Sequence, residues 1–90
     1  MHVCIVDDES ICRLITQKLI EKIALESRIT QFENGQEAFE FISNWRHDTR
    51  RLPGLIFLDI NMPLTNGWEF LDLLQDPNFH DYHPLVYICS

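Results

Sequence analysis

Short, strongly apolar runs alternate along the chain with longer segments in which apolar residues recur every three or four positions. The runs are rich in β-branched residues and give way to acids or turn residues, which is typical of strands buried in a sheet. They predict four strands, at residues 3–6, 28–32, 55–58 and 85–89. The run at 28–32 is the most polar of the four, so its strand signal is the weakest.

Three segments between these strands have the spacing of amphipathic helices. The first begins at Ser10, a residue type that favours the N-cap position, and its apolar residues lie along one side: Ile11, Leu14, Ile15, Leu19 and Ile23. The second follows the turn pair Asn34-Gly35 and carries Ala38, Phe39, Phe41, Ile42 and Trp45. The third, capped by Thr65 or Asn66, carries Phe70, Leu71 and Leu74.

The alternation of strands and helices predicts the fold class. Each right-handed crossover returns the chain to the same edge of the sheet, so successive strands pair in parallel. The expected fold is therefore α/β, a three-layer α/β/α sandwich. A chain of 90 residues has room for one domain of ordinary size, which we expect over residues 1–90.

Acidic residues follow two of the predicted strands. Asp7, Asp8 and Glu9 come directly after the first strand, and Asp59 comes directly after the apolar run of the third. In parallel α/β sheets ligands bind beyond the carboxyl ends of the strands, so these carboxylates meet if the two strands are neighbours. Crowded carboxylates repel one another and are usually paired, protonated or bound to a cation.

A cation fits this acidic group best. Its donors are all oxygens, with no Cys or His, and such a set favours a hard ion such as Mg²⁺. The alternative is that Asp7 or Glu9 only begins the first helix, where acids are favoured by the helix dipole.

Composition narrows the classes of function. The net charge of -7, with only seven Lys and Arg residues, argues against a nucleic-acid surface, because phosphates are neutralised by basic side chains. No apolar run approaches the roughly 20 residues needed to cross a bilayer, and no signal peptide is recognisable, so we expect no membrane partner and a cytoplasmic location. Cys4, Cys12 and Cys89 are expected to be small buried hydrophobic residues, and His80 and His83 to lie in a solvated loop.

Four features together resemble the receiver domain of two-component response regulators. They are the stretch Val6-Asp7-Asp8-Glu9, the block from Leu58 to Pro63, the pair Asn66-Gly67 and the order of the elements. The resemblance covers the whole chain and implies a flavodoxin-like parallel sheet with the strand order 2-1-3-4-5. It also implies a place in a phosphorelay, in which the chain accepts a phosphoryl group and catalyses at most its own phosphorylation and dephosphorylation.

The resemblance assigns a role to each site residue. Asp59 would be the phosphoacceptor and a ligand of Mg²⁺, Asp8 would ligate the ion directly, and Asp7 would assist through water. Asn61 would offer its backbone carbonyl to the ion, and the hydroxyl of Ser90 would hydrogen-bond the phosphoryl group. The phosphoryl donor would be a phosphohistidine on a sensor histidine kinase or a phosphotransfer protein.

The sequence ends at Ser90, directly after the fourth predicted strand. The family's fourth helix, fifth strand and fifth helix, with a lysine that contacts the phosphoryl group, have no counterpart in it, so we expect a fold truncated after the fourth strand. A fragment of a longer regulator and a short product completed by another chain are both open. Such a chain would expose an apolar edge at residues 85–89 and a half-covered sheet face, which predicts a homo-oligomer formed through the fourth strand.

Two other classes of function remain. A receiver-like interaction module that is not phosphorylated would explain the missing lysine. A phosphatase with an aspartyl nucleophile is disfavoured, because Asn61 stands where that class has a second Asp.

Overall fold

The computed structural model describes residues 1–24, 26–60, 62, 67–79 and 81–89. Strands and helices alternate along the chain as the sequence predicts. In order they are β1 (His2–Val6), α1 (Ser10–Ile23), β2 (Arg28–Phe32), α2 (Gly35–Asn44), η1 (Thr49–Arg51), β3 (Leu55–Asp59), α3 (Gly67–Leu73), η2 (Pro77–Phe79) and β4 (Leu85–Cys89), where η1 and η2 are single 3₁₀ turns.

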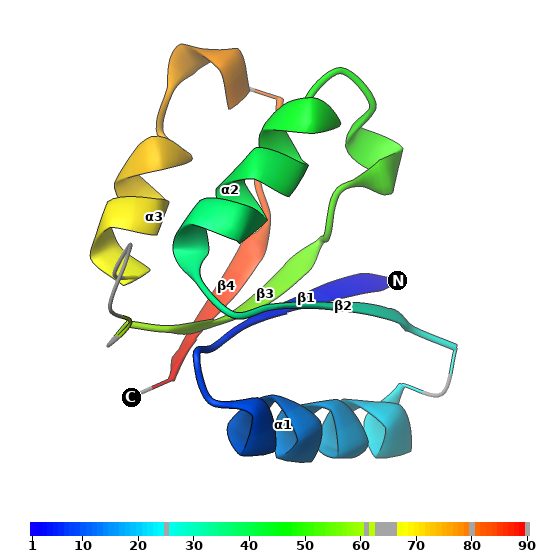
Figure 1. Ribbon diagram of the computed structural model, residues 1–90. Coiled ribbons are helices and arrows are strands. Elements are labelled where there is room, and N and C mark those ends of the chain that lie inside the picture. Colours follow the sequence, from blue (N-terminus) through cyan, green and yellow to red (C-terminus); the bar gives the residue numbers. More distant parts are fainter. Residues whose placement is uncertain (25, 61, 63–66, 80, 90) are drawn as a thin grey trace.

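The four strands form one parallel sheet in the order β2-β1-β3-β4. One helix, α1, lies on one face of the sheet, and α2 and α3 lie on the other (Figure 1). This confirms the predicted three-layer α/β/α sandwich with a flavodoxin-like sheet. All four predicted strands are present, and β1 and β3 each extend by one residue, to His2 and Asp59.

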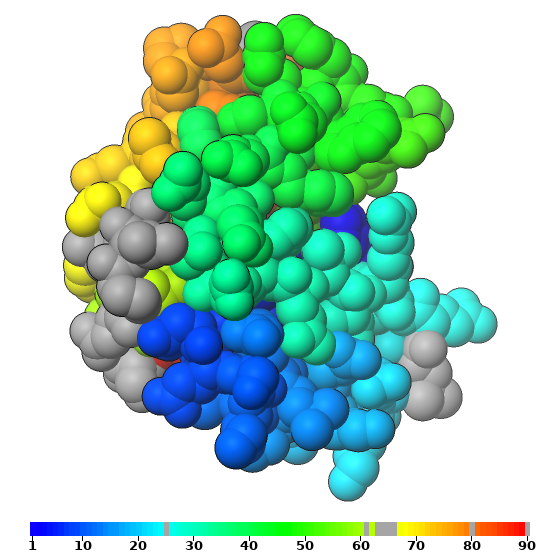
Figure 2. Space-filling model, viewed as in Figure 1, coloured from blue at the N-terminus to red at the C-terminus, as the bar shows by residue number. Residues whose placement is uncertain are grey.

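The larger core lies between the sheet and the pair of helices α2 and α3. Its fully buried side chains include Ala38 and Ile42 of α2 and Phe70 of α3, packed with alternate residues of β1 and β3. In Figure 2 the atoms of α2 and those of α1 lie on opposite sides of the sheet, and little of β1 remains visible between them. Burial of these apolar side chains supplies most of the driving force for this half of the fold.

The core beneath α1 is much smaller. It consists of Val3 and Ile5 of β1 with Ile20, the buried residue of α1. The side chain of Arg13 instead anchors α1 to the β2 edge, where its Nε donates to Oε1 of Gln31 at 3.2 Å. The predicted apolar residues do lie on this helix, but each is more than half exposed: Ile11, Leu14, Ile15, Leu19 and Ile23.

Helices α1 and α2 begin differently from the sequence prediction. Ser10 is the first residue of α1 rather than its cap, and the N-cap residue, Glu9, makes no side-chain capping bond. Asn34 is the N-cap of α2, where its Oδ1 accepts a hydrogen bond from the Glu37 N–H at 2.8 Å. The pair Asn34-Gly35 is therefore a helix start rather than a separate turn. Thr65 and Asn66, the predicted caps of the third helix, lie outside the described residues.

The cysteine prediction is wrong for two of the three residues. Cys4 is buried in β1, but Cys12 and Cys89 are exposed. Cys12 lies on a side of α1 that no neighbouring element covers in the described part of the chain, and Cys89 ends the edge strand β4. His83 is exposed as predicted, and His80 lies outside the described residues. Among the described residues, no helix combines the length and apolar character needed to span a membrane.

Candidate metal and phosphoacceptor site

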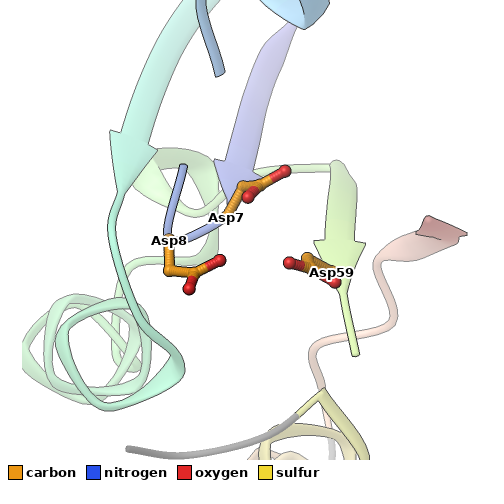
Figure 3. A group of neighbouring side chains, drawn as sticks. All are labelled: Asp7, Asp8 and Asp59. Carbon is orange, nitrogen blue, oxygen red and sulfur yellow. The ribbon is translucent and has the colours of Figure 1, made fainter. Parts of the chain in front are cut away.

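Three aspartates meet where β1 and β3 end. The register pairs Val6 of β1 with Leu58 of β3, so the residues that follow, Asp7 and Asp59, stand side by side. One carboxylate oxygen from each of Asp7, Asp8 and Asp59 lies within 4.8 Å of the other two. Figure 3 shows the Asp8 and Asp59 carboxylates turned toward the gap between the two strand ends. The predicted meeting is thus confirmed for Asp7, Asp8 and Asp59. The carboxylate of Glu9, which was expected at the same edge, is not part of this group and accepts a hydrogen bond from the Cys12 thiol instead.

The polypeptide after β1 is held by two hydrogen bonds. The Asp7 carboxylate accepts from the backbone N–H of Glu9 at 3.0 Å, which closes a tight local turn before α1. The guanidinium of Arg13 donates to the backbone carbonyl of Asp7 at 2.6 Å. Arg13 therefore fixes the backbone of the site through the Asp7 carbonyl and not through its carboxylate.

The electrostatics of the cluster are unfavourable without a cation. Partial burial raises the pKa of the Asp7 carboxyl group, and the neighbouring charges of Asp59, Asp8 and Glu9 raise it further, against the opposing effect of the Glu9 N–H bond. In the described part of the chain, no Lys or Arg forms an ion pair with Asp7 or Asp8. A bound divalent cation would remove this repulsion, because it converts like-charge neighbours into shared ligands.

The ligand set fits a hard divalent cation. All three converging donors are carboxylate oxygens, which suit Mg²⁺ better than a metal that prefers sulfur or nitrogen. Asp7 and Asp59 are partly buried whereas Asp8 is exposed, so the site is open on the side of Asp8. An open site leaves room for water and for phosphate oxygens, both of which Mg²⁺ usually keeps.

A cavity of about 500 Å³ opens beside the carboxylates. Besides the acids it is lined by side chains of α1 and β4, namely Cys12, Ile15, Thr16 and Cys89. The sequence did not predict these residues beside the acids, although Cys12 and Thr16 are four residues apart and so lie on one side of α1. Burial raises the pKa of the Cys89 thiol, and the nearby carboxylates of Asp7 and Asp59 raise it further. This thiol is therefore a poor nucleophile at neutral pH.

Gly67 closes the other side of the site. It is the first residue of α3, and its N–H donates to the Ile60 carbonyl at 3.2 Å. A Cβ at this position would lie 2.7 Å from Cα of Ile60 and 3.0 Å from the carbonyl oxygen of Asp59. Only glycine lets the start of α3 approach the segment after Asp59 so closely.

Two predicted site residues, Asn61 and Ser90, lie outside the described residues. Their proposed contacts with the ion and the phosphoryl group therefore stay predictions. The described part of the site consists of Asp7, Asp8 and Asp59, with Glu9 and the cavity beside them.

Comparison with known proteins matches this chain to a protein family. The description "Response regulator receiver domain" matches residues 3–90. A solved two-component response regulator from Cytophaga hutchinsonii is 28% identical, with a TM-score of 0.82, and the match covers 97% of this chain and 65% of that one. The N-terminal domain of a response regulator receiver protein from Methanoculleus marisnigri is 24% identical, with a TM-score of 0.76, and the match covers 99% of this chain and 65% of that one.

The receiver domain of an Arabidopsis thaliana histidine kinase, solved with Mg²⁺, shares the fold at 20% identity and a TM-score of 0.78, with coverage of 99% of this chain and 66% of that one. This chain thus spans about two thirds of the length of the solved receivers that it resembles. Among curated proteins, no relative matches it.

Proposed function

We propose that this chain, which belongs to the response regulator receiver domain family, accepts a phosphoryl group on Asp59 beside a bound Mg²⁺ ion. One observation carries the proposal. Asp7, Asp8 and Asp59 come from the ends of two neighbouring strands and bring three carboxylates within 4.8 Å of one another. This arrangement gives both a nucleophile and an ion site, which phosphoryl transfer needs together.

Asp59 is suited to the nucleophilic role by its position. It is the last residue of β3, partly buried, and a cavity of about 500 Å³ opens beside it, which would leave room for a phosphoryl group. A carboxylate oxygen of Asp59 attacks the phosphorus of a phosphohistidine, the P–N bond breaks, and its electron pair leaves with the imidazole nitrogen. The product is an acyl phosphate on Asp59 and a free histidine on the donor.

Asp7 and Asp8 hold the ion in this proposal. Mg²⁺ would neutralise charge on the phosphoryl oxygens during transfer, which lowers the repulsion between the donor and the acidic site. Asp8, which is exposed, would ligate it directly, and Asp7 would assist through water. The family resemblance adds the backbone carbonyl of Asn61 as a ligand and the hydroxyl of Ser90 as a donor to the phosphoryl group.

The partner follows from the family. We propose that a sensor histidine kinase or a phosphotransfer protein donates the phosphoryl group, in the cytoplasm, and that the chain catalyses no reaction beyond its own phosphorylation and dephosphorylation. The acidic surface, with a net charge of -7, supports a protein partner over a nucleic acid.

Incubation with a small phosphodonor and Mg²⁺, followed by intact mass measurement, tests the proposal. We expect one added phosphoryl group, labile to hydroxylamine as acyl phosphates are, and none in Asp59→Asn. Asp72→Asn, which removes an exposed carboxylate of α3, is the matched control and should be labelled like the wild type.

Label that persists in Asp59→Asn would place the phosphoryl group elsewhere and contradict the assignment. A chain that binds Mg²⁺ and remains unlabelled would instead favour the second class, a receiver-like interaction module.

A further inference from the structure

Arg13 joins three elements at the acidic site. It lies near the start of α1, partly buried, and its Nη1 donates to the Asp7 carbonyl at 2.6 Å. Its Nε donates to Oε1 of Gln31 in β2 at 3.2 Å. The side-chain amide of Gln31 in turn donates to Oε1 of Gln17, which lies four residues after Arg13 on the same side of α1. One guanidinium thus links α1, the segment after β1 and β2, which is the edge strand farthest from β4.

The peptide group between Asp7 and Asp8 is held by these contacts. The Asp7 N–H donates to the Phe32 carbonyl of β2 at 3.1 Å, and the Asp7 carboxylate accepts from the Glu9 N–H. The carbonyl is the remaining polar group of Asp7, and Arg13 binds it. Because a peptide group is planar, an anchored carbonyl also fixes the direction in which the chain enters Asp8. The bond from Arg13 therefore helps to aim the Asp8 side chain.

Arg13 reaches the site without neutralising it. Its two bonds go to a backbone carbonyl and to an amide oxygen, both of which are uncharged groups. The positive charge of Arg13 close to the acids would by itself oppose a bound cation. A positioning role predicts the opposite effect on cation affinity, because a ligand that is held in place in advance binds a metal more tightly. The two roles of Arg13 can thus be separated by the sign of one measurement.

We propose that Arg13 is a positioning residue of the cation site. By holding the Asp7 carbonyl against α1 and β2, it prearranges the carboxylates of Asp7 and Asp8 for a divalent cation. Arg13 is not itself a ligand, since a guanidinium has donors and no acceptor. The inference rests on the proposed function, because it concerns the ion that Asp7 and Asp8 would hold.

Titration with Mg²⁺, read from the Asp8 amide in proton–nitrogen correlation spectra, tests this role. Arg13→Met removes both donors and should bind Mg²⁺ about tenfold more weakly than the wild type, as is usual when a residue that orients a metal ligand is lost. Arg13→Lys keeps a donor for the Asp7 carbonyl and should restore most of the affinity. Lys18→Met is the matched control, because it removes an exposed cation from the same helix, and it should not weaken binding.

A second measurement needs no ion. Hydrogen exchange of the Asp7 amide, which donates to the Phe32 carbonyl, should be at least fivefold faster in Arg13→Met than in the wild type. Ile42→Val controls for a general loss of stability, because it shortens a fully buried side chain in the core beneath α2. Its Mg²⁺ affinity should equal that of the wild type.

Equal or tighter Mg²⁺ binding by Arg13→Met, beside a wild type that binds saturably, would overturn the positioning role and leave the cation site standing. An equal loss of affinity in Ile42→Val would also overturn it, because the loss would then follow stability rather than the Arg13 bond. A folded wild type that does not bind Mg²⁺ would contradict the proposed ion site itself, and the positioning role with it.

Discussion

The two faces of the sheet differ in how completely their helices bury apolar side chains. On one face, α2 and α3 lie side by side, and Ala38, Ile42 and Phe70 have no exposed surface. On the other face, α1 is the one helix among the described residues, and Ile20 is its buried residue. Both faces carry helices with apolar residues at helical spacing. The comparison shows that periodicity reveals which side of a helix is apolar, whereas burial of that side depends on a second element beside it.

Truncation of one side chain on each face should give the largest difference in the free energy of unfolding. Phe70→Ala removes a fully buried ring and should cost about 3–5 kcal/mol of unfolding free energy, because the cavity it leaves cannot fully close. Ile23→Ala, at an exposed residue of α1, should cost no more than about 0.5 kcal/mol. Urea denaturation of both variants at a concentration where the chain is monomeric measures the difference, and equal costs would contradict the comparison.

A second contrast concerns two glycines. Gly67→Ala forces a methyl group against the backbone of Ile60 and should cost about 1–3 kcal/mol, because the atoms it meets include backbone atoms and not only the end of a flexible side chain. Gly54→Ala is the control, since nothing lies within 4 Å of its added Cβ, and it should be nearly neutral. Thermal unfolding should give a lower melting temperature for Gly67→Ala than for Gly54→Ala. Equal melting temperatures would show that α3 does not approach Ile60 so closely.

Substitutions at the N-termini of α1 and α2 should differ less in their effect on the free energy of unfolding. Asn34→Ala removes the side-chain cap of α2 and should cost about 1 kcal/mol. Ser10→Ala should change the unfolding free energy by much less, because no side-chain cap bond is present at the start of α1. Urea denaturation can compare them, and a larger loss for Ser10→Ala would show that the hydroxyl caps the helix in solution.

The smallest expected effect is a pH dependence at the carboxylates. The pKa of Asp7 is raised above 3.8 in the folded chain, so the folded state binds more protons than the unfolded state just above that pH. Stability should therefore fall as the pH rises through this window, in the absence of divalent ions.

The control for this effect is Asp7→Asn, in which the fall should be smaller. Added Mg²⁺ should also reduce it in the wild type. Chemical denaturation between about pH 4 and pH 7 measures both, and stability that rises more steeply with pH in the wild type than in Asp7→Asn would show the opposite sign.

Much of the fold and the site could be predicted from the sequence. The short apolar runs of β1 and β3 are typical of buried strands, so both elements could be predicted from sequence. Parallel pairing brings the carboxyl ends of neighbouring strands together, and the meeting of Asp7, Asp8 and Asp59 could therefore be predicted as well. Spacing alone could not predict the exposure of Ile11 and Ile23, because it depends on tertiary contacts that no local pattern encodes.

Two local features were also missed, for similar reasons. Ser10 has the residue type of a cap, but the chain enters α1 one residue earlier, after the Asp7 carboxylate has already bonded the Glu9 N–H. Cys12 and Cys89 were expected to be buried because of their residue type, yet they line the cavity at the open ends of α1 and β4. In both cases the neighbours in space decide the environment.

Titration with Mg²⁺, followed in amide proton–nitrogen correlation spectra, tests most directly whether the ends of β1 and β3 form a cation site. We predict saturable shifts of the amides of Asp8 and Asp59, which are lost in Asp8→Asn and retained in Asp72→Asn. Shifts that do not saturate in the folded wild type, or that persist unchanged in Asp8→Asn, would contradict the site.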